Sequence, residues 1–278
     1  MPPSVFGVRE FTEASSPSEG YAEEIRIAGF CILRDVIGPE TLVSSRDSLD
    51  RIYEIQLEEI GGPERLAMIN DRWTVRAPLA YDALFLKMAA IPEILSVVTA
   101  LIGSPFCLML QNGVINVPLN GQQPNTGAWH RDLNYQHFVS SRPLSISVLF
   151  CIDEFTEENG ATMVLPGSHK VERFPSDSYV DGHQHTIRAP AGSAILFDSM
   201  LFHRGGFNRS GQPRRAVNHM YSIPLLKQQI SFPRLLQGRH ADDPLLRQLL
   251  GYDFEPAESV TAFREVRLAR ARKQSESE

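Results

Sequence analysis

Apolar positions in the first hundred residues recur at helical spacing. A short apolar run at residues 29–34 indicates a strand, after which Gly38 and Pro39 open a helix, because proline suits the first helical turn. That helix is expected to end at about residue 60, just before Gly61 and Gly62. The same reasoning predicts two further helices, over residues 79–90 and 92–103.

From about residue 106 the pattern changes to short apolar runs separated by turn residues. Residues 144–152 alternate between large apolar side chains and Ser, Leu or Cys, which is typical of a strand with two different faces. Further strands are predicted at residues 161–165, 193–197 and 215–223. Short strands at this spacing, without helices between them, predict an antiparallel sandwich or jelly roll.

These elements are expected to form one domain over residues 1–278, mainly β with a helical N-terminal layer. The predicted parts are a loose lead-in at 1–20, a mostly helical layer at 21–105, a β core at 106–225, a C-terminal helical region at 226–269 and a disordered tail at 270–278.

Composition and charge narrow the classes of partner. The net charge is −6 and 22% of the residues are charged; no basic stripe is present, which argues against a nucleic-acid partner. No apolar run approaches the ~18 residues of a membrane span, and no signal peptide opens the chain, so we expect a cytoplasmic protein. Three scattered cysteines are too few for a disulfide framework, and Cys31 and Cys151 lie in apolar runs typical of buried thiols. Both a monomer and a homodimer are compatible with this composition.

Three side chains from two distant segments form the most informative motif. His130 and Asp132 are two residues apart, so on a strand both point to the same side, and His203 follows a second apolar run. Two imidazoles and one carboxylate on one face of an octahedral ion are the ligands of non-heme Fe(II) oxygenases, which leave three positions open. We therefore predict that these three residues bind the metal and are the catalytic centre.

A His-x-Asp pair alone is weak, because a chain of this composition contains roughly 0.4 such pairs by chance. A second pair, His240 and Asp242, precedes a predicted helix start, where aspartate acts as a cap. His183 and His185 form another candidate pair in a polar loop. The remaining histidines considered, His137, His169 and His219, are expected to be structural.

An arginine eleven residues after the last predicted ligand strengthens the first motif. The far carboxylate of a dicarboxylate cosubstrate such as 2-oxoglutarate suits the fork of a guanidinium, and Arg214 opens the strand after His203. The alternative is that Arg214 is a surface charge at a turn. Because Arg214 follows the three predicted metal ligands, we favour its role as an anchor for the far carboxylate of the cosubstrate.

The ordered segments resemble the phytanoyl-CoA dioxygenase family of Fe(II)/2-oxoglutarate oxygenases. The matching segments are residues 129–135, 158–169 and 203–208, followed by Arg214, with weaker likeness at 29–39 and 107–118. The resemblance implies a double-stranded β-helix (a cupin-like jelly roll), with His130, Asp132 and His203 on iron and Arg214 on 2-oxoglutarate.

The resemblance also suggests finer contacts. It places a polar contact to 2-oxoglutarate at Gln111 or Asn112. Two positions depart from the pattern, because Gly205 replaces a small hydroxyl residue and Leu149 replaces an aromatic residue. The family's halogenases lack the carboxylate ligand, so the presence of Asp132 favours hydroxylation or a related oxidation.

The predicted function is Fe(II)- and 2-oxoglutarate-dependent oxidation with O2, most simply hydroxylation, of a small molecule of secondary metabolism. Phe138, Arg142 and Arg188 are candidate substrate contacts, and the loops 118–128 and 175–185 are candidate rims of the site. The alternatives are an acyl-CoA 2-hydroxylase of the same family, a non-redox metal hydrolase, and a silent cupin-like binding protein. Without a basic cluster for CoA phosphates, a free small molecule is favoured.

Overall fold

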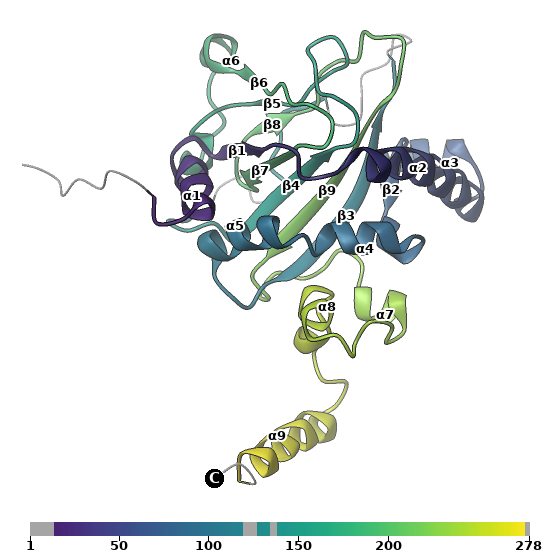
Figure 1. Ribbon diagram of the computed structural model, residues 1–278, viewed down its shortest axis with the longest axis vertical. Helices are drawn as coiled ribbons and strands as arrows, with labels where there is room; N and C mark the ends of the chain where they lie inside the picture. The colour runs from purple at the N-terminus through teal and green to yellow at the C-terminus, as the bar shows by residue number, and fades with distance from the viewer. Residues whose placement is uncertain (1–13, 119–126, 134–137, 276–278) are drawn as a thin grey trace, which may run out of the picture.

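Two antiparallel sheets form the centre of the computed structural model, which describes residues 14–118, 127–133 and 138–275 (Figure 1). The larger sheet has the order β1-β7-β4-β9-β3-β2, and the smaller has the order β6-β5-β8. The strands are β1 (Phe30–Leu33), β2 (Thr74–Arg76), β3 (Cys107–Asn116), β4 (Ser145–Cys151), β5 (Met163–Val164), β6 (His185–Thr186), β7 (Ala194–Asp198), β8 (His203–Arg204) and β9 (Arg214–Ser222).

The N-terminal helices cover one face of the larger sheet, and the other helices come after β5 in the chain (Figure 1). The N-terminal helices are α1 (Pro17–Ala28), α2 (Pro39–Ile60), α3 (Pro63–Met68), η1 (Pro78–Ala80), α4 (Ala83–Ala89) and α5 (Pro92–Ile102). The later ones are η2 (Ser168–Lys170), α6 (Asp177–His183), α7 (Phe232–Leu236), α8 (Pro244–Leu249), η3 (Tyr252–Phe254) and α9 (Val260–Ser275).

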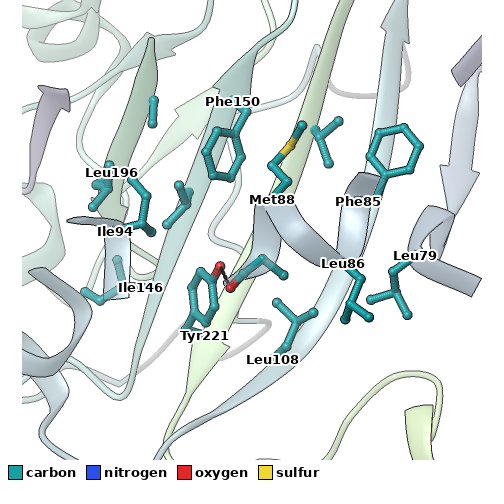
Figure 2. Packing of buried hydrophobic residues seen from close by; sticks show 14 of the residues in the cluster. Leu79, Phe85, Leu86, Met88, Ile94, Leu108, Ile146, Phe150, Leu196 and Tyr221 are labelled. Atoms are coloured by element: carbon teal, nitrogen blue, oxygen red, sulfur yellow. Dashed lines mark hydrogen bonds between the residues drawn. The ribbon is translucent and has the colours of Figure 1, made fainter. Parts of the chain in front are cut away.

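The main core lies between the larger sheet and helices α4 and α5 (Figure 2). Phe85 of α4 and Ile94 of α5 are fully buried there, as is Leu108 of β3. Tyr221 pairs with Leu108 across β9 and β3, and its hydroxyl donates to the Ala89 carbonyl at 2.9 Å. Each buried large apolar side chain contributes about 1.5–3 kcal/mol, so this layer fixes the sheet on the helices.

The opposite face of the larger sheet packs against the smaller sheet. Phe197 of β7 and Ala216 of β9 belong to the same buried cluster as Val164 of β5. Side chains on a strand alternate between the two faces. Every second residue of β3, β4 and β9 therefore points away from the helices, toward the space where the site lies.

The N-terminal elements agree in part with the sequence-based expectations. The helix predicted at 79–90 is divided into η1 and α4, and α3 and β2 were not predicted. Strand β1, helix α2 and helix α5 lie where they were predicted. Helix α1 was missed, because its first residues fall in the predicted lead-in. It begins at Pro17, and the Ser16 hydroxyl accepts a hydrogen bond from the Glu19 amide at 3.2 Å, which is an N-terminal cap.

The C-terminal elements differ more from the sequence-based expectations. The expected helical stretch is divided into α7 and α8, and Asp243 caps α8 by accepting from the Leu246 amide. Helix α9 continues to Ser275 into the segment predicted to be disordered. Its Arg- and Ala-rich sequence favours helix formation. The low hydrophobicity on which the prediction was based bears on packing against a core, and not on helix formation.

No single helix in the described residues is long and apolar enough to cross a membrane. One pair, α4 with α5, meets the length and composition test jointly, bent by 46° at the break between them. Both helices bury apolar residues in the core. The prediction of free thiols is confirmed, since Cys31, Cys107 and Cys151 are free and buried.

Candidate metal centre

The structure brings the three predicted ligands together between the two sheets. His130 and His203 pair as antiparallel neighbours, each donating its amide to the other's carbonyl at 2.9 and 3.0 Å. Asp132 Oδ1 lies 3.4 Å from His203 Nε2 and 3.8 Å from His130 Nε2. All three ligand atoms lie within 4.8 Å of one another, which suits one transition-metal ion.

Hydrogen bonds behind each ligand fix its orientation. His130 Nδ1 is 2.9 Å from the Ala128 carbonyl, and His203 Nδ1 is 3.0 Å from the Leu201 carbonyl. A carbonyl can only accept, so each Nδ1 carries the proton and each Nε2 lone pair faces the centre. Ser147 donates to Asp132 Oδ2 at 2.5 Å, which leaves Oδ1 for the metal. Metal-binding histidines and carboxylates usually have such hydrogen bonds on the side away from the metal, because these bonds fix the tautomer and the orientation of the ligand.

Arg131, between the two ligands of the motif, was not predicted to matter. Its side chain points away from the centre, is buried, and donates to the Met200 carbonyl at 2.8 Å. It also donates to the carbonyls of Ser168, Val171 and Glu172, and its guanidinium lies 3.9 Å from the centre of the Phe202 ring. Arg131 therefore joins the motif to the segment that leads to His203.

Burial and neighbouring charges set the ionisation of the centre. Burial raises the pKa of Asp132, but His203, His130 and the Ser147 hydroxyl outweigh it and bring the pKa to about 2. Burial and the nearby His203 lower the pKa of His130. Burial also acts to lower the pKa of His203, but Asp132 outweighs it, so that this pKa is raised. A permanent carboxylate beside imidazoles is the state that binds a cation.

Arg214 lies in the same pocket as the three ligands. It is buried and donates from Nη2 to the Gly160 carbonyl at 3.1 Å, and its guanidinium lies 4.0 Å from the centre of the Phe155 ring. Burial lowers its pKa to about 10, so it stays a cation at neutral pH. Within the described residues its guanidinium forms no ion pair with a carboxylate, and its Nε has no acceptor. A buried cation with unused donors fits an anionic ligand.

The pocket has a volume of about 240 Å³ and is lined by the three ligands, Arg214 and neighbouring strand residues. Gly205 and Leu149, the two departures from the family pattern, both line it. Without a hydroxyl at 205 or an aromatic ring at 149, these positions offer space rather than polar contacts to a cosubstrate.

The two predicted candidates on β3 have different positions. Asn112 lines the pocket. Gln111, the other candidate, does not line the pocket, because consecutive strand residues face opposite sides and Gln111 points toward the helices. There its Nε2 donates to the Phe85 carbonyl and its Oε1 accepts from the Leu79 amide.

The three predicted substrate residues do not line the pocket. Phe138 is exposed, and Arg142 lies on the surface. Arg188 forms an exposed ion pair with Glu157. Parts of the predicted rim, residues 119–126, lie outside the described residues, and the other predicted rim contains helix α6.

The other histidines remain apart from the centre. His183 stacks on Tyr179 with ring centres 4.0 Å apart, and in the part of the chain that is described neither His183 nor His240 belongs to a cluster of three possible ligands. His169 and His219 are buried. His137 lies outside the described residues.

The sequence of this chain matches the model of one known protein family. The model of the phytanoyl-CoA dioxygenase (PhyH) family matches residues 25–216, which include every residue of the centre. This chain belongs to the phytanoyl-CoA dioxygenase family. The family lies within the Fe(II)/2-oxoglutarate-dependent oxygenase superfamily, and the triad found here is a candidate for its metal site.

Relatives of this PhyH-family chain extend over most of its length. The uncharacterized protein Rv1501 of Mycobacterium tuberculosis is 35% identical over 217 residues, covering 77% of this chain and 78% of the relative. Two solved structures share the fold. The epimerase SnoN, in complex with Fe³⁺, α-ketoglutarate and nogalamycin RO, aligns with a TM-score of 0.56 and 17% identity over 77% of this chain and 88% of its own. HygX from Streptomyces hygroscopicus, with nickel, 2-oxoglutarate and hygromycin B bound, aligns with a TM-score of 0.55 and 16% identity over 75% and 88%.

Proposed function

We propose that this family member hydroxylates an unactivated C–H bond of a small organic molecule of specialised metabolism in the cytoplasm, using Fe(II), 2-oxoglutarate and O2. The observation that carries the proposal is the pocket itself, where three metal-type ligands face one cavity together with a buried arginine that has no carboxylate partner among the described residues. The two packed antiparallel sheets support a jelly-roll interpretation of the fold.

The residues present fit both groups that this chemistry needs. His130, Asp132 and His203 would hold the iron on one face, and Arg214 would hold the distal carboxylate of 2-oxoglutarate. When bound, iron with 2-oxoglutarate supplies the oxidising power to activate O2 and cleave a C–H bond. The protein orients the ligands through Ser147 and the backbone carbonyls of Ala128 and Leu201.

The presence of Asp132 favours oxygen transfer over halogenation. A halide on iron needs a ligand position, which becomes available when the carboxylate is replaced by a small residue. Here the carboxylate is kept ionised, with a pKa of about 2, and is oriented by Ser147. Asp132 would therefore serve as the third protein ligand of the iron, beside His130 and His203.

The nature of the substrate is proposed from the pocket and from the relatives. SnoN was solved with nogalamycin RO and HygX with hygromycin B, both small molecules of specialised metabolism. The pocket here, at about 240 Å³, is below the ~300–1,000 Å³ typical of sites that enclose a whole drug-sized ligand. We therefore expect a substrate that inserts one end into the pocket.

The proposed function is tested by reconstituting the protein with Fe(II) and 2-oxoglutarate. Under anaerobic conditions a weak visible charge-transfer band should form, and under air 2-oxoglutarate should be converted to succinate, faster when a metabolite library contains the substrate. Absence of both the band and succinate would contradict the proposal. Turnover that proceeds without O2 and 2-oxoglutarate would instead support a non-redox metal hydrolase.

A further inference from the structure

The two histidine ligands lie on backbone segments that run antiparallel to each other. His130 and His203 exchange both backbone hydrogen bonds, at 2.9 and 3.0 Å, and form an isolated bridge. In this register the residues on either side of the bridge are also neighbours across the two segments. These neighbours are Trp129 with Arg204, and Arg131 with Phe202. None of the four lines the metal pocket, because successive side chains of an extended segment point to opposite sides.

On the face away from the metal pocket, each of these pairs consists of an arginine over an aromatic ring. The guanidinium carbon of Arg131 lies 3.9 Å from the centre of the Phe202 ring, and that of Arg204 lies 5.1 Å from the centre of the Trp129 ring. Both distances are short enough for a cation to be attracted to the face of the ring. The pairs are crossed, because one arginine comes from each segment. We call these two contacts the back-face pairs.

A third aromatic ring connects the two back-face pairs. The centre of the Phe174 ring lies 6.0 Å from that of Trp129 and 4.9 Å from that of Phe202, where the two rings meet edge to face at 86°. Leu165 and Val180 pack in the same apolar cluster as Trp129 and Phe202. The two pairs therefore belong to one packed layer behind the histidine ligands.

Arg204 has few polar partners that could explain its position. Its Nη2 donates to Gln184 Oε1 at 3.1 Å, just after helix α6, whereas its Nε is buried and has no acceptor among the described residues. An N–H group that is buried without an acceptor is unfavourable, so hydrogen bonding alone does not account for this side chain. A planar, weakly hydrated guanidinium stacks well on an aromatic face, which makes the Trp129 ring its main partner.

The back-face pairs lie where they oppose rotation of one ligand segment against the other. A single bridge of two hydrogen bonds fixes the distance between the segments but leaves their relative rotation free. One back-face pair precedes the bridge and the other follows it on the segment of His130, so together they resist this rotation. The imidazole rings of His130 and His203 lie 4.3 Å apart at their centres, and a small rotation would change the separation of their Nε2 atoms.

We propose that Trp129 and Arg204 are positioning residues for the metal. Their contact holds the two ligand segments in the rotation at which the Nε2 atoms of His130 and His203 can bind one ion. Neither residue touches the metal pocket, so both act through the histidines beside them. The proposal rests on the metal-binding part of the proposed function, and it does not depend on the substrate.

The test titrates the apoprotein with Co(II), whose visible d–d bands report the geometry of the ligands as well as the occupancy of the site. Arg204→Met keeps most of the side-chain length and removes the cation. We expect the Co(II) affinity to fall about fivefold, because a contact of this kind is lost. The d–d bands at saturation should also change in position or intensity. Arg204→Lys keeps a cation beside the ring and should recover most of the affinity.

A double-mutant cycle assigns the effect to the contact itself. Trp129→Leu alone should weaken Co(II) binding about as much as Arg204→Met, and the double variant should be no weaker than either single variant, because both changes remove the same contact. Arg267→Met is the matched control. Arg267 lies 5.6 Å from the centre of the Phe263 ring on helix α9, so this variant loses a similar contact far from the metal and should keep the affinity and the bands of the parent.

Three results would overturn the proposal. The first is an Arg204→Met variant with the Co(II) affinity of the parent. The second is a variant that loses affinity but has the parent's bands at saturation, as expected of a general loss of stability. The third is a double variant in which the two single effects multiply. Failure of the proposed function is a different result, because the parent would then give no Fe(II)–2-oxoglutarate band and no succinate, whereas the Co(II) titrations would still decide the role of Arg204.

Discussion

At the scale of single residues, Asp132 uses its two oxygens differently. Oδ2 accepts from Ser147, whereas Oδ1 faces both imidazoles. The Ser147 hydroxyl is also 2.9 Å from that of Ser199. A short chain of hydroxyl groups therefore decides which carboxylate oxygen is presented to the ion.

Replacing Ser147 with alanine should weaken metal binding about 10–100-fold without unfolding the protein, because the carboxylate loses its orienting hydrogen bond. Titration of the apoprotein with Fe(II) or Co(II) measures the effect. Ser145→Ala is the matched control on the same strand, since that buried hydroxyl has no partner among the described residues. Equal metal affinity in the two variants would contradict the assigned role of Ser147.

Replacing Arg214 with methionine should raise the 2-oxoglutarate concentration needed for half-saturation at least about tenfold, because a charge-assisted pair is lost in a buried site. Iron binding should be unchanged, since Arg214 is not a ligand. Arg215→Met is the comparison, because Arg215 pairs with Asp50 and Asp153 outside the pocket. A cosubstrate requirement that rises equally in both variants would count against the anchor.

At the scale of elements, the close approach of helix α2 to the larger sheet depends on a residue without a side chain. A Cβ added to Gly113 of β3 would lie 2.5 Å from Leu49 Cδ2 of α2 and 3.1 Å from Val75 Cβ of β2. Since α2 also supplies Gln56, which binds the Arg76 backbone, this contact sets the distance between the helix and the pocket wall.

Gly113→Ala should therefore lower the free energy of unfolding by about 1–3 kcal/mol, as is typical for overpacking in a core. Urea denaturation measures it. Gly211→Ala is the control, because no atom lies within 4 Å of the added Cβ there. An unchanged midpoint for Gly113→Ala would show that α2 moves away without cost.

Many helix and strand positions and the candidate metal ligands could be predicted from the sequence, because they depend on local signals. The other residues of the site could not be predicted in this way. Helix α2 is bounded by local signals, and the ligands share a spacing that a strand projects to one side. Arg131 and the ion pair of Asp71 with Arg76 act through partners that the sequence does not indicate, such as the Met200 carbonyl and Asn112. Alternation shows that only one of Gln111 and Asn112 faces the pocket, but which one depends on the packing of the whole sheet.

At the scale of the whole molecule, stability should depend on pH through His219. Burial lowers its pKa from 6.5 to about 3, and its ring lies 2.6 Å from Gln111 Nε2. Between these pH values the unfolded chain binds a proton that the folded chain excludes, so stability is fully present above pH 6.5 and is lost as pH falls toward 3.

Relative to His219→Gln, the parent protein should lose about 2–3 kcal/mol more of its unfolding free energy between pH 6.5 and 4.5. Urea midpoints of the two apoproteins at both pH values measure this difference. Burial also raises the pKa of Asp198 to about 6, which has the opposite sign, but that carboxyl is present in both proteins and its effect cancels. Parallel pH profiles would contradict the assignment to His219.

The hydrogen bonds of Arg131 affect which nearby residues can change during evolution. The guanidinium holds main-chain carbonyls of residues 168, 171 and 172, and not their side chains. Ser168 and Val171 also line a second cavity, of about 520 Å³, beside α6. Mutations that keep the local backbone path can thus change the shape of that cavity while the three candidate metal ligands stay in place. The surface around the site can therefore vary without altering the geometry of the candidate metal centre.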